Sequence, residues 1–283
     1  MPFPEQVRAS FVVTAVVDIM KRLGTPKAEM ELYRPVIQYV ETMVRIADAE
    51  TEAAQHDGPE NTTPTGWRAG IEDILSHYGL RDSPAMDELN RMAAWADLEI
   101  SLMTGTVLPT TDAVRASCYE RCSDITLLLA VAHQLAGLTL GTPLARLLRH
   151  VFANAEILDD LRSYDKDVRE GAFNTYQSLV WMYGTEQAAD RLRCVRGRIL
   201  RDLLTDLRSA DTATLLRFGA VFDLLPAPLR AVAADDRLTG TAAHLPQRYL
   251  LPIVRRRLCG TPWFKDSPIP KARPTDPPWA AAD

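Results

Sequence analysis

Residues 156–174 hold the densest group of side chains that could carry out chemistry. Asp159, Ser163 and Asp167 follow one another at intervals of four residues. On an α-helix this spacing puts them on one face, with about 6 Å of rise between neighbours. Carboxylate and hydroxyl oxygens suit a hard divalent cation such as Mg²⁺, which binds oxygens at about 2.0–2.1 Å and commonly holds a phosphate. The spacing therefore predicts a Mg²⁺ site on this helix.

An amphipathic helix whose acidic side faces water explains the same pattern. The face opposite the three oxygen-bearing residues is apolar and consists of Ile157, Leu161, Tyr164 and Val168. Such a helix packs its apolar face on a core and needs no ligand. Only residues elsewhere in the chain can distinguish the two interpretations.

Length, composition and charge are those of a globular protein. The 283 residues are 47% hydrophobic, which is enough for a sizeable core, and the net charge of −5 argues against a nucleic-acid-binding surface. No signal-peptide pattern or run of 18 uncharged apolar residues occurs. The cysteines lack CxxC spacing and are Cys118, Cys122, Cys194 and Cys259. We expect a cytoplasmic, reduced protein with no membrane insertion and no nucleic-acid partner.

Helical periodicity runs through nearly the whole sequence, and strand-like alternation is almost absent. The predicted helices cover residues 5–23, 25–55, 67–78, 85–104, 110–139, 142–171, 174–183, 185–209, 212–224, 227–235 and 242–258. Pro35 is expected to kink the second helix. The proline-rich residues 261–283 are expected to be extended or disordered. The fold class is therefore predicted to be all-α, as a single-domain bundle of about ten helices over residues 1–260.

A phosphate held by a metal ion would also need ligands on a facing wall. Asp48 and Glu52 lie four residues apart and so share a face of the second predicted helix. They follow the mostly apolar run 43–46, as expected for a helix that enters a core. An acidic helix end that faces water is the alternative for this pair.

Cationic and phenolic donors for such a phosphate are Arg121, Lys166, Arg248 and Tyr249. Arg121 stands shortly before the apolar run 126–132, where a charged group is costly to bury without partners. Arginine makes bidentate contacts to phosphate, and tyrosine adds a phenolic donor. We expect these four residues to contact the phosphate.

Together these residues resemble the motifs of a class I terpene synthase (terpene cyclase) of the bacterial type with a single α-domain. That family binds Mg²⁺ through Asn/Asp-Asp-x-x-Ser/Thr-x-x-x-Glu, and Asp159, Ser163 and Asp167 match it with Asp in the last position. The residues Lys166, Gly171 and Asn174 fit the continuation of the motif.

Two further motifs fit in order along residues 119–249. In the family an Arg that senses the diphosphate is followed three residues later by an Asp linker and then by an effector residue at a helix break. Arg121, Asp124 and Ile125 fit this spacing. An Arg-Tyr pair downstream contacts the diphosphate in the family, and Arg248-Tyr249 would supply it.

The chain departs from the family pattern at three places. The effector is usually Gly, and here it is Ile125. The first aspartate-rich motif, Asp-Asp-x-x-Asp, is absent, and Asp48 with Glu52 is a degenerate substitute. Asp167 is one methylene shorter than the usual Glu, so a metal ion there would lie closer to the backbone.

The resemblance implies a class I terpenoid synthase-like fold and a Mg²⁺-dependent cyclase with three metal ions. Its substrate would be a prenyl diphosphate of the C20 class, either geranylgeranyl or copalyl-type diphosphate. The enzyme would ionise this substrate, cyclise or rearrange the carbocation and release diphosphate. A homodimer is compatible with these features.

Two alternatives to a cyclase stay open. A head-to-head condensing or chain-elongating prenyltransferase uses Asp-rich motifs on both helices, and Ser163 stands where it would have an Asp. A non-catalytic helical scaffold would keep the acidic helix merely solvated. Aromatic residues that could line a carbocation pocket, although each also fits an ordinary core position, are Tyr119, Phe152, Phe173, Trp181, Tyr183 and Phe222.

Overall fold

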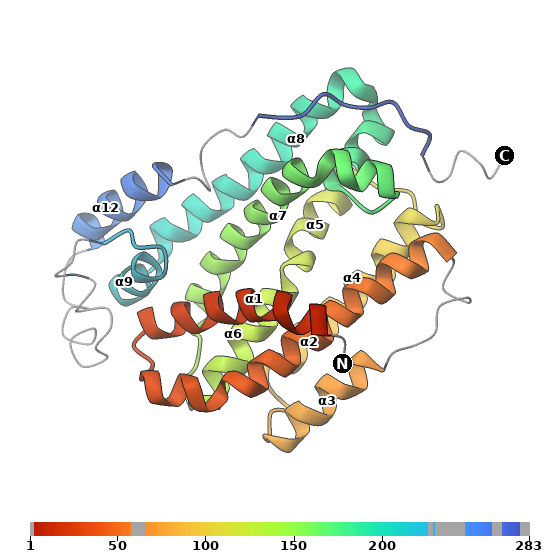
Figure 1. Ribbon diagram of the computed structural model, residues 1–283. Coiled ribbons are helices and arrows are strands. Elements are labelled where there is room, and N and C mark those ends of the chain that lie inside the picture. Colours follow the sequence, from red (N-terminus) through yellow and green to blue (C-terminus); the bar gives the residue numbers. More distant parts are fainter. Residues whose placement is uncertain (1–2, 58–65, 226–228, 230–246, 262–267, 278–283) are drawn as a thin grey trace.

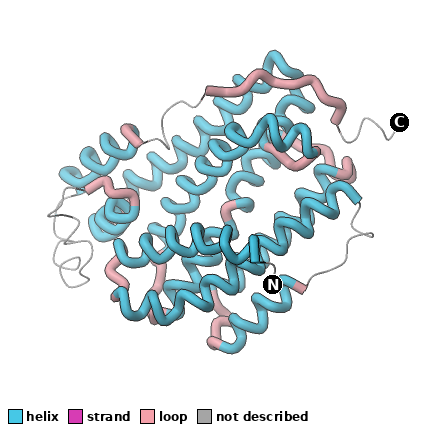
Figure 2. The backbone as a smooth tube through the Cα atoms, viewed as in Figure 1, coloured by secondary structure: helices cyan, strands magenta, loops and turns pink. Residues whose placement is uncertain are grey.

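The computed structural model describes residues 3–57, 66–225, 229, 247–261 and 268–277, and all regular secondary structure in these residues is helical (Figure 1). The helices are α1 (Phe3–Arg22), α2 (Lys27–Asp57), α3 (Trp67–His77), α4 (Pro84–Met103), α5 (Thr111–Arg121), α6 (Ser123–Leu135), α7 (Thr142–Glu170), α8 (Thr175–Ser209), α9 (Thr212–Val221) and α12 (Gln247–Cys259). The all-α prediction is confirmed. Figure 2 shows the helices as long rods whose connecting loops lie mostly at their ends.

Helix α7 has the boundaries that its end residues predict. It begins with Pro143 in its first turn, where the missing N–H of proline costs nothing. It ends at Gly171, whose φ of 66° is left-handed and favours glycine. The Asn174 side chain then accepts hydrogen bonds from the backbone N–H groups of Tyr176 and Gln177 and so caps α8. This tight turn fixes the acidic end of α7 against the start of α8.

The predicted helix over residues 110–139 is two helices, α5 and α6. The chain breaks at Cys122, with φ −74° and ψ 8°, and the Ser123 hydroxyl donates to the carbonyl oxygen of Glu120. Neither glycine nor proline marks the break, which is why helical periodicity alone did not predict it. The family resemblance implied a break at Ile125, but Ile125 lies within α6, and the break is three residues earlier, at Cys122.

The two helices predicted over 174–183 and 185–209 are joined in the single helix α8. Gly184 has non-helical angles, φ 75° and ψ 166°, and kinks the helix at the predicted position. The helix predicted over 227–235 lies outside the described residues except for residue 229. Of the helix predicted over 242–258, the part from Gln247 onward is described, as α12.

Helix α7 borders the two larger clusters of the hydrophobic core. Its first half, including Leu147 and Val151, packs in a large cluster with α1, α2, α6 and α9. Its second half, including Ile157 and Tyr164, packs in a second cluster with α5 and α8. Figure 1 shows α7 running between α8 and α5 through the middle of the molecule. The acidic stretch is therefore carried by an element that is fixed on both sides.

Residues 268–277 are extended and packed against α7 and α8, where the sequence favoured an extended or disordered tail. The Arg273 backbone N–H donates to the Tyr164 hydroxyl at 2.9 Å. The Thr275 hydroxyl accepts from the Gln177 amide at 2.6 Å and from the Trp181 indole N–H at 2.9 Å. In Figure 1 this segment, in dark blue, passes over α8. Among the described residues, no helix is long and apolar enough to cross a membrane.

Candidate active site

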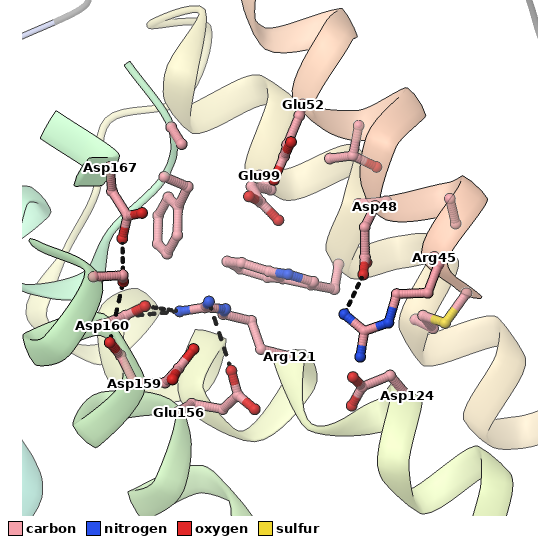
Figure 3. Close-up of a pocket in the computed structure, with 18 of the residues that line it drawn as sticks. Arg45, Asp48, Glu52, Glu99, Arg121, Asp124, Glu156, Asp159, Asp160 and Asp167 are labelled. Carbon is pink, nitrogen blue, oxygen red and sulfur yellow. Dashed lines mark hydrogen bonds and ion pairs between the residues drawn. The ribbon is translucent and has the colours of Figure 1, made fainter. Parts of the chain in front are cut away.

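A cavity of about 460 Å³ lies between α2, α4, the α5–α6 junction and α7 (Figure 3). Carboxylates line it from four helices: Asp48 and Glu52 from α2, Glu99 from α4, Asp124 from α6, and Glu156, Asp159, Asp160 and Asp167 from α7. The cationic side chains in its lining are Arg45, Arg121 and Lys166. Acidic groups outnumber basic ones, so the cavity attracts cations.

The α7 wall carries the predicted oxygen set. Asp159, Ser163 and Asp167 all border the cavity, as their spacing predicts. The Ser163 hydroxyl lies 2.5 Å from Asp167 Oδ2, and the Asn174 amide donates to the same oxygen at 2.8 Å. Asp167 therefore accepts both hydrogen bonds through one carboxylate oxygen, Oδ2. Asp159 makes no side-chain hydrogen bond within the described residues.

The donor chemistry of this wall fits Mg²⁺. Two carboxylates and a hydroxyl are hard oxygen ligands, and the hydrogen bonds from Ser163 and Asn174 orient Asp167 as outer partners commonly orient metal ligands. In the described part of the chain, no three His, Cys, Asp or Glu side chains converge on one point as a complete metal site.

The α2 wall presents Asp48 and Glu52 across the cavity from α7 (Figure 3). Asp48 Oδ2 lies 3.5 Å from Arg45 Nη1. The Asp48 side chain is 54% exposed and lies in the cavity wall. Desolvation by the surrounding protein, reinforced by the negative charge of Asp124, raises the pKa of Asp48 to about 7 despite the opposing Arg45.

The guanidinium of Arg121 lies between the α2 and α7 walls and forms ion pairs with carboxylates of α7. Its Nη1 lies 2.7 Å from both carboxylate oxygens of Asp160, and its Nη2 lies 3.6 Å from Glu156. The guanidinium lies 5.6 Å from the centre of the Phe173 ring. Burial alone would lower the pKa of Arg121, but Asp160, Glu156 and Glu99 raise it well above its ordinary value. Arg121 is thus a fixed positive charge in the cavity, and its contact with a phosphate stays a prediction.

Asp124 also lines the cavity, and Ile125 does not. The Asp124 carboxylate accepts a hydrogen bond from the backbone N–H of Ile125, and burial raises the pKa of Asp124. The Ile125 side chain packs against the large core cluster instead. The expectation that Ile125 acts on the substrate is therefore not supported by its position.

Lys166 borders the cavity from the exposed surface of α7. Its side chain is 64% exposed, and its ammonium group lies 3.4 Å from Glu170. This position leaves Lys166 free to turn toward an anion in the cavity, because the ion pair with Glu170 is a weak surface pair.

Arg248 and Tyr249 do not reach the cavity. They lie on α12, which packs on α9 and α8 through the buried stripe Leu250, Val254 and Leu258. This stripe leaves the two predicted residues on the exposed side, where Arg248 Nη2 lies 3.4 Å from the Tyr249 hydroxyl and Tyr249 is 60% exposed. The structure thus does not bring this pair together with the other predicted residues.

Sequence reasoning missed several residues of the cavity. Glu99 and Trp95 lie on one face of α4 and Glu156 precedes Asp159 on α7, so helical spacing could have indicated them. Burial raises the pKa of Glu156 to about 8, with Arg121 opposing the shift. Trp95 packs edge-on against Phe173 at 5.2 Å. Among the aromatic residues proposed from sequence, Phe173 lines the cavity, and the others do not.

The cavity therefore combines two carboxylate-bearing walls, a fixed arginine between them and an aromatic pair. Its residues come from segments more than a hundred positions apart, from Arg45 to Phe173. Comparison of the chain with protein-family models, with curated proteins and with solved structures finds no match.

Proposed function

We propose that this protein is a Mg²⁺-dependent terpene cyclase with a class I terpenoid synthase-like fold. It would ionise a prenyl diphosphate, cyclise or rearrange the resulting carbocation and release diphosphate. One observation carries the proposal: the α7 oxygen set, the α2 carboxylates and Arg121 all line one cavity. These groups come from motifs that lie far apart in sequence. A single acidic helix that merely faces water would not explain why they line the same cavity.

The residues of the cavity would first hold the leaving group. Mg²⁺ bound to the α7 set would neutralise charge on the departing diphosphate. Asp159, Ser163 and Asp167 would be its ligands on α7, with Asp48 and Glu52 as the facing carboxylates. Arg121 stays charged between Asp160 and Glu156 and would stabilise the negative charge that develops as the carbon–oxygen bond breaks.

The apolar part of the lining would then hold the carbocation. Trp95 and Phe173 offer aromatic rings, whose π-faces attract a cation. Met92, Ala47 and Ala96 add apolar side chains to the lining. A C20 diphosphate, linear or already cyclised, is the substrate class that the motif resemblance favours.

A prenyltransferase is the competing enzyme. In the cavity Ser163 stands between Asp159 and Asp167 and donates a hydrogen bond to Asp167, whereas a prenyltransferase would present an aspartate at this place. The serine therefore favours the cyclase.

Turnover assays separate these functions. The purified full-length protein is incubated with Mg²⁺ and C15 or C20 prenyl diphosphates, and hydrocarbon products and released diphosphate are measured. A cyclic hydrocarbon or alcohol with released diphosphate supports the cyclase, whereas a longer or condensed chain indicates a prenyltransferase. Absence of turnover, together with absence of a Mg²⁺-dependent thermal shift on adding diphosphate, contradicts both enzymes and leaves the scaffold.

A pair of variants tests the α7 site within that assay. Asp159→Ala is expected to abolish turnover with unchanged helical circular dichroism, because it removes a ligand without touching the core. Asp165→Asn is the control, since Asp165 lies on the same helix but pairs with Arg273 outside the cavity. Equal turnover in wild type and Asp159→Ala would refute the assignment of Asp159.

A further inference from the structure

A stripe of charged residues runs along α2 into the cavity. Glu41, Arg45, Asp48 and Glu52 follow at intervals of four, three and four residues and so lie on one face of the helix. Glu41 is fully buried at the inner end of this stripe. Arg45, Asp48 and Glu52 line the cavity itself.

The guanidinium of Arg45 is held in place by its own helix. Its Nε donates to Glu41 Oε1 at 2.8 Å, and its Nη1 lies 3.5 Å from Asp48 Oδ2. Within the described residues, Nη2 donates no hydrogen bond. Figure 3 shows Arg45 beside Asp48, with Asp124 below it and Arg121 further along the cavity. One edge of the guanidinium is thus anchored while donors remain for a ligand.

We infer that Arg45 is a diphosphate-binding residue, which supplies a fixed positive charge on the α2 wall in place of one bound metal ion. The inference rests on the proposed function, because the anion is the diphosphate of that reaction. Guanidinium groups bind phosphate oxygens through two parallel hydrogen bonds. Asp48 then orients Arg45, and Glu52, which has no hydrogen bond or ion pair in the described part of the chain, is the carboxylate of this wall left for a metal ion.

The charge of Arg45 is not cancelled by its closest partner. Burial raises the pKa of Glu41 to about 8 even though Arg45 opposes the shift, so near pH 7 the carboxyl group is mostly protonated. A surface ion pair would show the opposite, with both partners charged and exposed. Asp48, at 3.5 Å, and Asp124 also act on Arg45, so the donors that Arg45 leaves unused at the cavity wall remain its main provision for an incoming anion.

Binding of inorganic diphosphate tests the inference without turnover. Affinity is measured by titration calorimetry at saturating Mg²⁺ for wild type, Arg45→Gln, Arg45→Lys and Arg34→Gln. Arg34 is the control because it lies on α2 and pairs with Glu31 but does not line the cavity. Loss of charge-assisted hydrogen bonds is expected to weaken binding about tenfold or more in Arg45→Gln. Arg45→Lys, which keeps the charge but not the planar donor pair, is expected to lose less, and Arg34→Gln nothing.

The outcomes separate the inference from the proposed function. If wild type binds Mg²⁺-diphosphate and Arg45→Gln binds it equally well, Arg45 is structural and the inference fails. If wild type itself binds no diphosphate, the proposed function is wrong, and the inference, which rests on it, is wrong as well. Should Arg45→Gln not fold, Arg45→Lys decides: unchanged diphosphate affinity in this variant overturns the inference, and a severalfold loss supports it.

Discussion

Arg121 and Asp160 join the end of α5 to the middle of α7, with Arg121 Nη1 at 2.7 Å from both oxygens of the Asp160 carboxylate. Asp160 is 2% exposed and also accepts from the backbone N–H of Thr175 at 2.9 Å. This one carboxylate therefore fixes three elements: α5, α7 and the start of α8. Arg121, which we propose to act on the diphosphate, is positioned by the same residue that ties the acidic wall into the fold.

Asp160→Asn is expected to destabilise the protein strongly. The substitution leaves the guanidinium of Arg121, whose side chain is 20% exposed, without its closest counter-charge. Breaking a buried ion pair typically costs about 3–5 kcal/mol, and the remaining partner Glu156 at 3.6 Å offsets part of this cost. Urea denaturation measures the change, with Asp165→Asn as the control because Asp165 is 62% exposed in its ion pair with Arg273. A loss below about 1 kcal/mol in Asp160→Asn would mean that Arg121 is held by other groups.

Stability is expected to fall as the pH rises from about 4.5 to 8. Burial raises the pKa of Glu41 from 4.5 to about 8, so the folded state keeps a proton that the unfolded chain has already lost. The stabilisation is complete below the unfolded pKa and disappears as the pH passes the folded pKa, with a slope of up to about 1.4 kcal/mol per pH unit for this one group.

Glu41→Gln separates this group from other carboxylates of the cavity. The amide resembles the protonated carboxyl group, so the variant should match wild type near pH 5 and exceed it in stability near pH 8.5. Urea midpoints measured across this range give the slope. Glu31→Gln is the matched control, since Glu31 lies on α2 in an exposed pair with Arg34. An identical slope in wild type and Glu41→Gln would show that Glu41 is ionised in the folded protein.

The extended segment 268–277 is expected to stabilise α7, the helix that carries the acidic wall. Thr275→Val removes the oxygen that accepts from Gln177 and Trp181, which should cost about 1–3 kcal/mol because the amide of Gln177, 1% exposed, loses its acceptor. Thr275→Ser keeps the oxygen and is the control. Thermal unfolding compares the two variants, and equal midpoints would mean that these hydrogen bonds contribute no net stability.

Helix positions and the shared face of Asp159, Ser163 and Asp167 could be predicted because each depends on local sequence. Pro143 and Gly171 mark the ends of α7, and a spacing of four residues determines a helix face without knowledge of any other element. The same spacing predicts that Asp48 and Glu52 share a face of α2, but only the packed structure shows that this face borders the cavity.

Tertiary features could not be predicted in this way. The break at Cys122 depends on hydrogen bonds of Ser123 and its neighbours, and no proline or glycine marks it. Arg45 has the sequence spacing of an ordinary helix ion pair with Glu41, and only burial against α4 and α6 distinguishes it. Arg248 follows the order of the family motifs, but the packing of α12 decides where it points.

Ser163→Ala is expected to weaken the response to Mg²⁺ without unfolding the protein. The hydroxyl lies on the cavity wall and holds Asp167 at 2.5 Å, so its loss removes one proposed oxygen ligand and frees the carboxylate on that side. The Mg²⁺ concentration at half-saturation, measured through turnover or through the thermal shift with diphosphate, should rise about tenfold.

Ser163→Thr retains the hydroxyl and is expected to remain close to wild type. Asn174 still donates to Asp167 at 2.8 Å, so the effect should be smaller than the loss caused by Asp159→Ala. Equal Mg²⁺ requirements in Ser163→Ala and wild type would exclude the serine from the metal site and leave Asp159 and Asp167 as its α7 ligands.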